Sequence, residues 1–123
     1  MQTNSQRIME AMPSFEDFMN LAEEIKKLSV AKMKLENSIK AKEGESFRQV
    51  MTDEHFFVNG KPVAVSYYEN AFKFGGLDGR LVLVRDELAE IQASLELKRN
   101  QFEVYKQMHD MFKTLVYQER VLA

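Results

Sequence analysis

The sequence predicts a mainly α protein, an antiparallel helical hairpin or coiled coil that forms part of an oligomeric helical bundle. Two long segments carry apolar residues at alternating spacings of three and four, the pattern of an amphipathic helix with an apolar seam. The stretch between them is rich in aromatic and turn-forming residues, and it predicts a small β-hairpin and a short helix inserted at the turn. A chain of 123 residues suits one domain.

Composition narrows the class of protein further. The chain is 45% hydrophobic and 29% charged, with few Gly and Pro, which is typical of a folded helical protein. The absence of cysteine excludes disulfides, thiolate metal sites and thiol nucleophiles. We find no apolar leader core and no run of about 18 apolar residues, so we expect a soluble, cytoplasmic protein without a membrane partner. A formal net charge of -2 means that only a local patch could attract nucleic acid.

Residues 1–13 are predicted to form an N-terminal arm or short helix. Its apolar residues are Ile8, Met9 and Met12. Pro13 then interrupts it, because proline lacks an N–H donor and its ring clashes with the preceding helical turn. We expect the remaining residues, 14–123, to form one helical-hairpin domain.

The first long helix of this domain is predicted over residues 14–43. Ser14 is a good N-cap, and Asp17 three residues later completes a pattern like a capping box. Gly44 follows a basic last turn and predicts the end of the helix. The apolar seam consists of Phe18, Leu21, Ile25, Leu28, Leu35 and Ile39.

Residues 45–77 are predicted to form a compact head that contains seven of the thirteen aromatic residues. Asn59-Gly60 is the strongest short-range signal for a β-hairpin, since a type I′ turn needs positive φ at both central residues. The flanking residues are apolar and rich in Val and Phe. We therefore predict a two-stranded hairpin over residues 55–65.

Capping patterns predict the two helices that follow. Ser66 and Glu69 match a capping box that opens a short helix over residues 67–74. Asp78 is the N-cap candidate of the longest helix, predicted over residues 78–119. The seam of this helix consists of Leu81, Val84, Leu88, Ile91, Leu95, Lys98, Phe102, Tyr105, His109, Phe112 and Val116.

The two long helices are predicted to differ in length, about 41 residues against about 30, or roughly 60 Å against 45 Å. If the head reverses the chain, residues whose numbers add to about 122 lie side by side, and the second helix overhangs the first. The overhang carries a second row of apolar residues, and exposure of this row to water is unfavourable. Either the N-terminal arm or, over a larger area, another subunit covers it. The predicted oligomer interface consists of Val104, Met108, Met111, Phe112, Leu115 and Val116.

The only basic run lies between residues 26 and 42, where six lysines accompany one acid. One interpretation is a ridge that contacts nucleic-acid phosphates, with head aromatics stacking on bases. The other is that the lysines pair with acids of the opposite helix or form a solvated face. The acids are Asp86, Glu87, Glu90 and Glu96. The candidate nucleic-acid contacts are Lys26, Lys27, Lys34, Lys40, Lys42, Lys61 and Lys73.

No catalytic or metal site is predicted, and no cofactor or small-molecule substrate. The polar turn 53–55 contains one His and two acids, and three adjacent side chains cannot all reach one metal ion. The segment 75–79 is rich in glycine but lacks the Gly-Lys-Ser/Thr ending of a phosphate loop. His109 on the seam is expected to fix register rather than to catalyse.

The order of long helix, β-hairpin and long helix resembles that of prefoldin-type chaperone subunits. The resemblance is architectural, and it implies coiled-coil helices, hairpins that assemble into a barrel, and holdase activity. The leading hypothesis is a non-enzymatic, homo-oligomeric helical interaction protein: an assembly, scaffold or adaptor component. The alternatives are a nucleic-acid-binding accessory protein and a prefoldin-like holdase chaperone.

Overall fold

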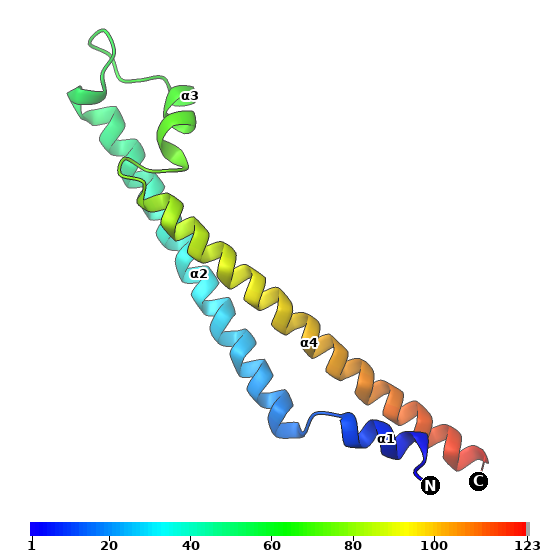
Figure 1. The fold of residues 1–123 in the computed structure, drawn as a ribbon. Helices are drawn as coiled ribbons and strands as arrows, with labels where there is room; N and C mark the ends of the chain where they lie inside the picture. Colours follow the sequence, from blue (N-terminus) through cyan, green and yellow to red (C-terminus); the bar gives the residue numbers. More distant parts are fainter. Residues whose placement is uncertain (123) are drawn as a thin grey trace. The chain divides into compact units, whose positions relative to one another are not determined.

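The computed structural model describes residues 1–122, and the protein is mainly helical, as predicted. In Figure 1 a head of short helical turns follows the first of the two longest helices along the chain and precedes the second. The elements in order are α1 (Asn4–Ala11), α2 (Phe15–Thr52), a 3₁₀ turn η1 (Glu54–Phe56), α3 (Val65–Tyr68), a π turn η2 (Glu69–Lys73) and α4 (Arg80–Leu122). Among the helices described, none combines the length and apolar character needed to cross a membrane.

The chain divides into two compact units, which we describe separately. Unit 1 consists of Met1–Ser29 and Ala93–Ala123, and unit 2 consists of Val30–Gln92. Both long helices therefore contribute one segment to each unit.

In unit 1, the N-terminal segment forms a short helix that is tied to α4. The Thr3 side chain caps α1 in a capping box with Gln6. Ser5 is buried, and its backbone N–H and hydroxyl donate to the carboxylate of Glu119 at 3.2 and 2.5 Å. α1 accordingly lies beside the C-terminal end of α4 (Figure 1).

The predicted start of the first long helix is confirmed. The N–H of Asp17 donates to the Ser14 hydroxyl, and the N–H of Ser14 donates to the Asp17 carboxylate, each at 3.1 Å. These two bonds satisfy backbone donors that the first turn of a helix otherwise leaves unpaired.

The seam residues of α2 and α4 pack together in unit 1. The ring of Phe18 meets those of Phe102 and Tyr105 edge to face, at centroid distances of 5.4 and 5.5 Å. Glu24 and Lys98 form an ion pair at 2.9 Å, in the antiparallel register expected from numbers that add to about 122. Leu21 and Leu95 are the buried seam residues. His109 is exposed, and it lines a groove together with the seam residues Phe18 and Phe102, so it does not fill a buried seam position.

In unit 2, α2 continues to Thr52, beyond the predicted end at residue 43. Gly44 lies inside the helix, with no positive φ, and does not terminate it. Helical spacing beyond it brings Phe47 against Tyr68, with ring centroids 4.9 Å apart, and buries Val50 completely. Burial of these side chains outweighs the low helix propensity of one glycine, which costs about 1 kcal/mol.

The predicted β-hairpin over residues 55–65 is wrong, because the described residues contain no strand. The turn itself forms: Asn59 and Gly60 have φ of 54° and 77°, and Val58 and Lys61 make a single antiparallel bridge. The next rung of a ladder would need the N–H of Phe56. That N–H donates instead to the carbonyl of Asp53, within the 3₁₀ turn.

The short helix predicted over residues 67–74 begins earlier and changes type. α3 starts at Val65 after Ala64, which makes no side-chain cap, so the capping box expected from Ser66 and Glu69 does not form. From Glu69 the chain continues as a π turn.

The two long helices are less unequal than predicted, with 38 residues in α2 and 43 in α4. The difference from the expected 30 and 41 arises mainly from the part of α2 beyond Gly44. Unit 2 is held together by a core of Val50, Val63 and Tyr68, against which Met51, Phe56, Phe72 and Leu77 pack.

Candidate interaction surfaces

The predicted oligomer interface lies in unit 1 and is only partly free. Four of its residues are half-buried within the chain: Met108, Phe112, Leu115 and Val116. The contact between Ser5 and Glu119 places α1 at this end of α4, so the N-terminal segment supplies part of the cover. Val104 and Met111 remain about half exposed, at 51% and 52%.

Leu97 belongs to the same surface, although the sequence analysis did not include it. It is 67% exposed and lies seven residues before Val104, which itself lies seven residues before Met111. Positions seven apart fall on nearly the same line along a helix. The heptad spacing, continued one step back from Val104, identifies Leu97, which lies before the segment predicted to overhang α2.

This row lies on a face of α4 without charge, which we call the neutral face. With 3.6 residues per turn, an arc of about 120° on residues 93–118 contains ten residues, none of them charged. They are Ala93, Leu97, Asn100, Gln101, Val104, Gln107, Met108, Met111, Leu115 and Gln118. The charged residues of the same segment lie outside this arc. A charge-free, exposed face is unusual on a helix whose composition is otherwise rich in Glu, Lys and Arg.

A groove of about 590 Å³ lies on another side of unit 1, between the start of α2 and α4. Its walls are mainly apolar, with Phe15 and Met19 exposed on one side. The α4 side includes Phe102 and the polar groups of Lys106 and Asp110.

The lysines of the basic run do not pair with the acids opposite. Within residues 1–122, Lys32 is the only lysine of this run in an ion pair, with Glu36 one turn later at 3.7 Å. The lysines exposed along α2 are Lys26, Lys27, Lys34 and Lys40, while Lys42 is half-buried. Among the residues described, the pairs with Asp86, Glu87, Glu90 and Glu96 do not form, and the exposed lysines agree with the other part of the same interpretation, a solvated face.

In unit 2, the two lysines predicted from the head differ in position. Lys73 and Lys40 line one cavity of about 300 Å³, together with the exposed edge of Phe47. Lys61 lies in the exposed turn and does not line this cavity. Glu43 and Glu69 also line it, so the two cations are accompanied by two acids.

Glu43 anchors the head on α2. Its backbone carbonyl accepts a 2.7 Å hydrogen bond from the Tyr68 hydroxyl, and its carboxylate pairs with Arg85. The Arg85 guanidinium also lies 5.3 Å from the centre of the Phe74 ring, a cation–π distance. These contacts connect α2, the short helical turns and α4 within unit 2.

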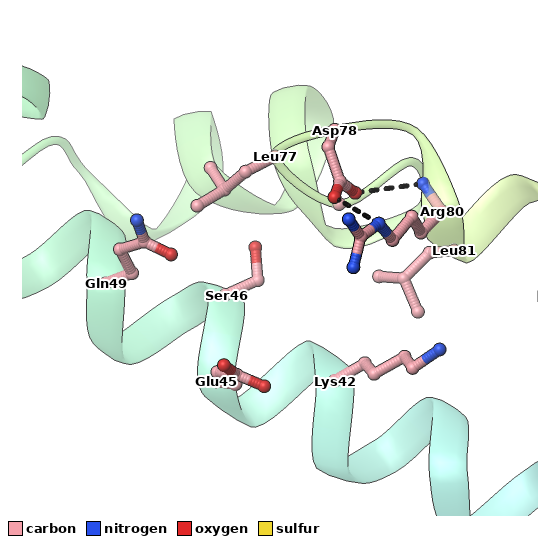
Figure 2. Close-up of a pocket in the computed structure, with 9 residues that line it drawn as sticks. Lys42, Glu45, Ser46, Gln49, Leu77, Asp78, Arg80 and Leu81 are labelled. Carbon is pink, nitrogen blue, oxygen red and sulfur yellow. Dashed lines mark hydrogen bonds and ion pairs between the residues drawn. The ribbon is translucent and has the colours of Figure 1, made fainter.

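A smaller cavity of about 160 Å³ separates α2 from the glycine-rich loop before α4 (Figure 2). The buried Ser46 hydroxyl points toward this loop and has no hydrogen-bond partner among residues 1–122. Asp78 accepts from the backbone N–H of Arg80 at 3.1 Å and pairs with its side chain at 2.7 Å. Glu45 and Lys42 add one further charge of each sign, so the lining favours neither an anion nor a cation.

The polar turn at residues 53–55 has a local structural role. Asp53 accepts from the backbone N–H of His55 at 3.0 Å and lies 2.8 Å from its ring Nδ1. The backbone hydrogen bond, followed by the ring contact, lowers the pKa of Asp53. Among the residues described, no group of three or more His, Asp and Glu side chains is arranged to hold a metal ion.

Comparison with known proteins gives no further assignment. No protein-family model, no curated protein and no solved structure matches this chain. Function must therefore be argued from the surfaces described above.

Proposed function

We propose that this protein is a non-enzymatic, homo-oligomeric interaction protein, which acts as an assembly, scaffold or adaptor component. The neutral face of α4 is the observation that supports this proposal. Leu97, Val104 and Met111 form a row of large, exposed apolar side chains within it. Removal of such area from water stabilises an assembly by about 25 cal/mol per Å².

The character of the flanking residues supports an interface rather than a solvated surface. Asn100, Gln101 and Gln107 surround Val104 with amides, which hydrogen-bond across an interface without the desolvation cost of a charge. Depletion of charge is typical of the buried centre of protein–protein interfaces. A face designed only for water would carry Lys and Glu at these positions.

The test is the mass of the protein in solution, measured by light scattering. We expect a multiple of the 14.4 kDa chain mass. Val104→Lys should weaken self-association by roughly tenfold or more, because it places like charges at the contact. Val121→Lys is the matched control, since Val121 is 65% exposed and lies outside the neutral face.

A monomeric mass for the unaltered protein at high micromolar concentration would disprove the proposal. So would equal masses for the unaltered protein and the Val104→Lys variant. Circular dichroism of both lysine variants checks that neither substitution has unfolded the helices.

The exposed lysines of α2 support a second candidate function, nucleic-acid binding as an accessory protein. Lys34 and Lys40 have no acidic partner among the residues described, and Lys40 lies with Lys73 beside the Phe47 ring. Lysines free of acids can contact phosphates, and an exposed ring can stack on a base.

Fluorescence anisotropy with a single-stranded oligonucleotide tests this candidate. We expect binding that weakens steeply with salt and falls when Lys34 and Lys40 are changed to Glu. Lys113→Glu makes the same charge change on α4, outside the basic run, and should have little effect. Absence of binding at low ionic strength would exclude this function.

The holdase alternative has lost its architectural support. Its resemblance to prefoldin-type subunits depended on a β-hairpin, and the described head has a single bridge instead. What remains is exposed Met and Phe side chains, which a test of aggregation suppression with an unfolded client would address.

A further inference from the structure

We infer that the partner of the neutral face is the same face of a second copy, with the two α4 helices parallel and in register. This inference rests on the proposed function and specifies its partner and orientation. The contact runs from Leu97 to Gln118, which is roughly 32 Å at 1.5 Å per residue. All the residues that carry it belong to one helix of unit 1.

The neutral face contains a second heptad seam, separate from the one that packs on α2. Its spacing alternates four and three, and its residues are Leu97, Gln101, Val104, Met108, Met111, Leu115 and Gln118. Five of the seven are apolar. Such a seam supercoils two helices around each other when they present it to one another.

Gln101 favours the in-register arrangement among parallel pairs. It has apolar seam residues on both sides, Leu97 before it and Val104 after it. In register, Gln101 of one copy faces Gln101 of the other, and the two amides can hydrogen-bond. A parallel pair shifted by one heptad would place Gln101 against Met108 and leave the amide without a partner. An antiparallel pair that overlaps the whole seam would place Gln101 against Gln118, so this residue selects the register and not the orientation. A single polar residue in a seam commonly fixes register in this way.

The charges beside the face favour the parallel orientation. One edge carries an acidic row with a spacing of seven, formed by Glu96, Glu103 and Asp110. The other edge carries a row with the same spacing and no acid, formed by Lys98, Tyr105 and Phe112. In a parallel pair the acidic edge of each copy meets this edge of the other. In an antiparallel pair the two acidic edges would meet and repel.

Disulfide cross-linking measures this arrangement directly, because the chain has no cysteine of its own. We expect Leu97→Cys, Val104→Cys and Met111→Cys each to form a covalent dimer on mild oxidation. Parallel helices in register bring each position against itself, within the 4.4–6.8 Å between Cα atoms that a disulfide needs. Val121→Cys, which is equally exposed but off the face, is the control and should remain mostly monomeric.

The other outcomes separate this inference from the proposed function. An antiparallel pair that overlaps the same seam would cross-link at none of the three positions, and a mixture of Val104→Cys and Leu115→Cys would then cross-link across copies. An oligomeric mass with no cross-link at the three positions would place the interface elsewhere. Either result overturns the inference while the proposed function stands. A monomeric mass would contradict both the inference and the proposed function. Equal cross-linking of Val121→Cys would indicate random collision between copies and would overturn the inference.

Gln101→Leu supplies a second readout. Loss of the paired amides should tighten self-association, since a polar seam residue costs stability, and should relax the register. In this background a mixture of Leu97→Cys and Val104→Cys, one heptad apart, should begin to cross-link across copies. Unchanged cross-linking in the Gln101→Leu background would contradict the role of Gln101 in setting register.

Discussion

Unit 1 and unit 2 bury their apolar surface in different ways. In unit 1 two helix segments meet along a regular seam, with Leu21 and Leu95 buried and edge-to-face rings between them. In unit 2 the buried centre is a cluster from separate elements, with Val50 of α2, Val63 of the loop and Tyr68 of α3. The seam occupies one side of α4, so the opposite side can carry a second row of apolar residues. In unit 2 the aromatic residues of the cluster pack against one another.

The difference explains where we place the interface. In the head, Phe56, Tyr68 and Phe72 contact one another within one cluster, so aromatic richness there reports a core. On α4 the row of Leu97, Val104 and Met111 has no such partner within the residues described. We therefore base the proposed interface on regular spacing with exposure rather than on aromatic content.

The largest expected effect tests the two sides of α4. Leu95→Ala removes a side chain that is 2% exposed, and it should lower the free energy of unfolding by about 2–5 kcal/mol. Leu97→Ala, two residues away on the neutral face, should change the stability of the monomer by about 0.5 kcal/mol or less. Urea unfolding of both variants at low concentration measures the contrast. Similar losses for the two would show that Leu97 is also a core residue.

Glycine substitutions in unit 2 should have smaller effects of opposite sign. Gly76 has φ of 68°, and an added Cβ would lie 3.4 Å from Leu81, so Gly76→Ala should destabilise by about 1 kcal/mol or more. Gly44 lies inside α2 with no atom within 4 Å of an added Cβ. Gly44→Ala should therefore stabilise by about 0.5–1 kcal/mol, as expected for a helix interior. Thermal unfolding compares them. Destabilisation by Gly44→Ala would mean that the helix ends near residue 43 after all.

The sequence predicted the regular part of this fold better than the irregular part. Helical spacing and the capping box at Ser14 depend on neighbours a few residues away, so the sequence predicts them directly. The fate of Gly44 and of the Asn59-Gly60 turn depends on distant contacts. Tyr68 packs on Phe47 and so stabilises the extension of α2 beyond Gly44. The 3₁₀ turn binds the N–H of Phe56, which a strand would need for its ladder.

The candidate interface was predicted for a reason that the structure changes. The expected overhang of α4 remains, because α2 begins at Phe15 while α4 continues to Leu122, but α1 lies at this end, where Phe112 and Val116 were thought to be free. Val104 and Met111 stay exposed because they lie on the far side of the seam. The charge-free character of that side was present in the sequence, but it becomes visible only once the extent of the helix is known.

The smallest expected effect concerns the start of the head. Asp53 has a pKa below its usual 3.8, mainly because the N–H of His55 donates to its carboxylate. A group whose pKa falls on folding stabilises the folded state above its unfolded pKa, and this contribution is lost as pH drops through the folded value. Asp53→Asn keeps an acceptor but removes the charge. The variant should therefore be slightly less stable than the unaltered protein at about pH 6, and the two should converge near pH 3. Urea midpoints at both pH values measure this difference, and a gap that widens toward acid would contradict the assigned role.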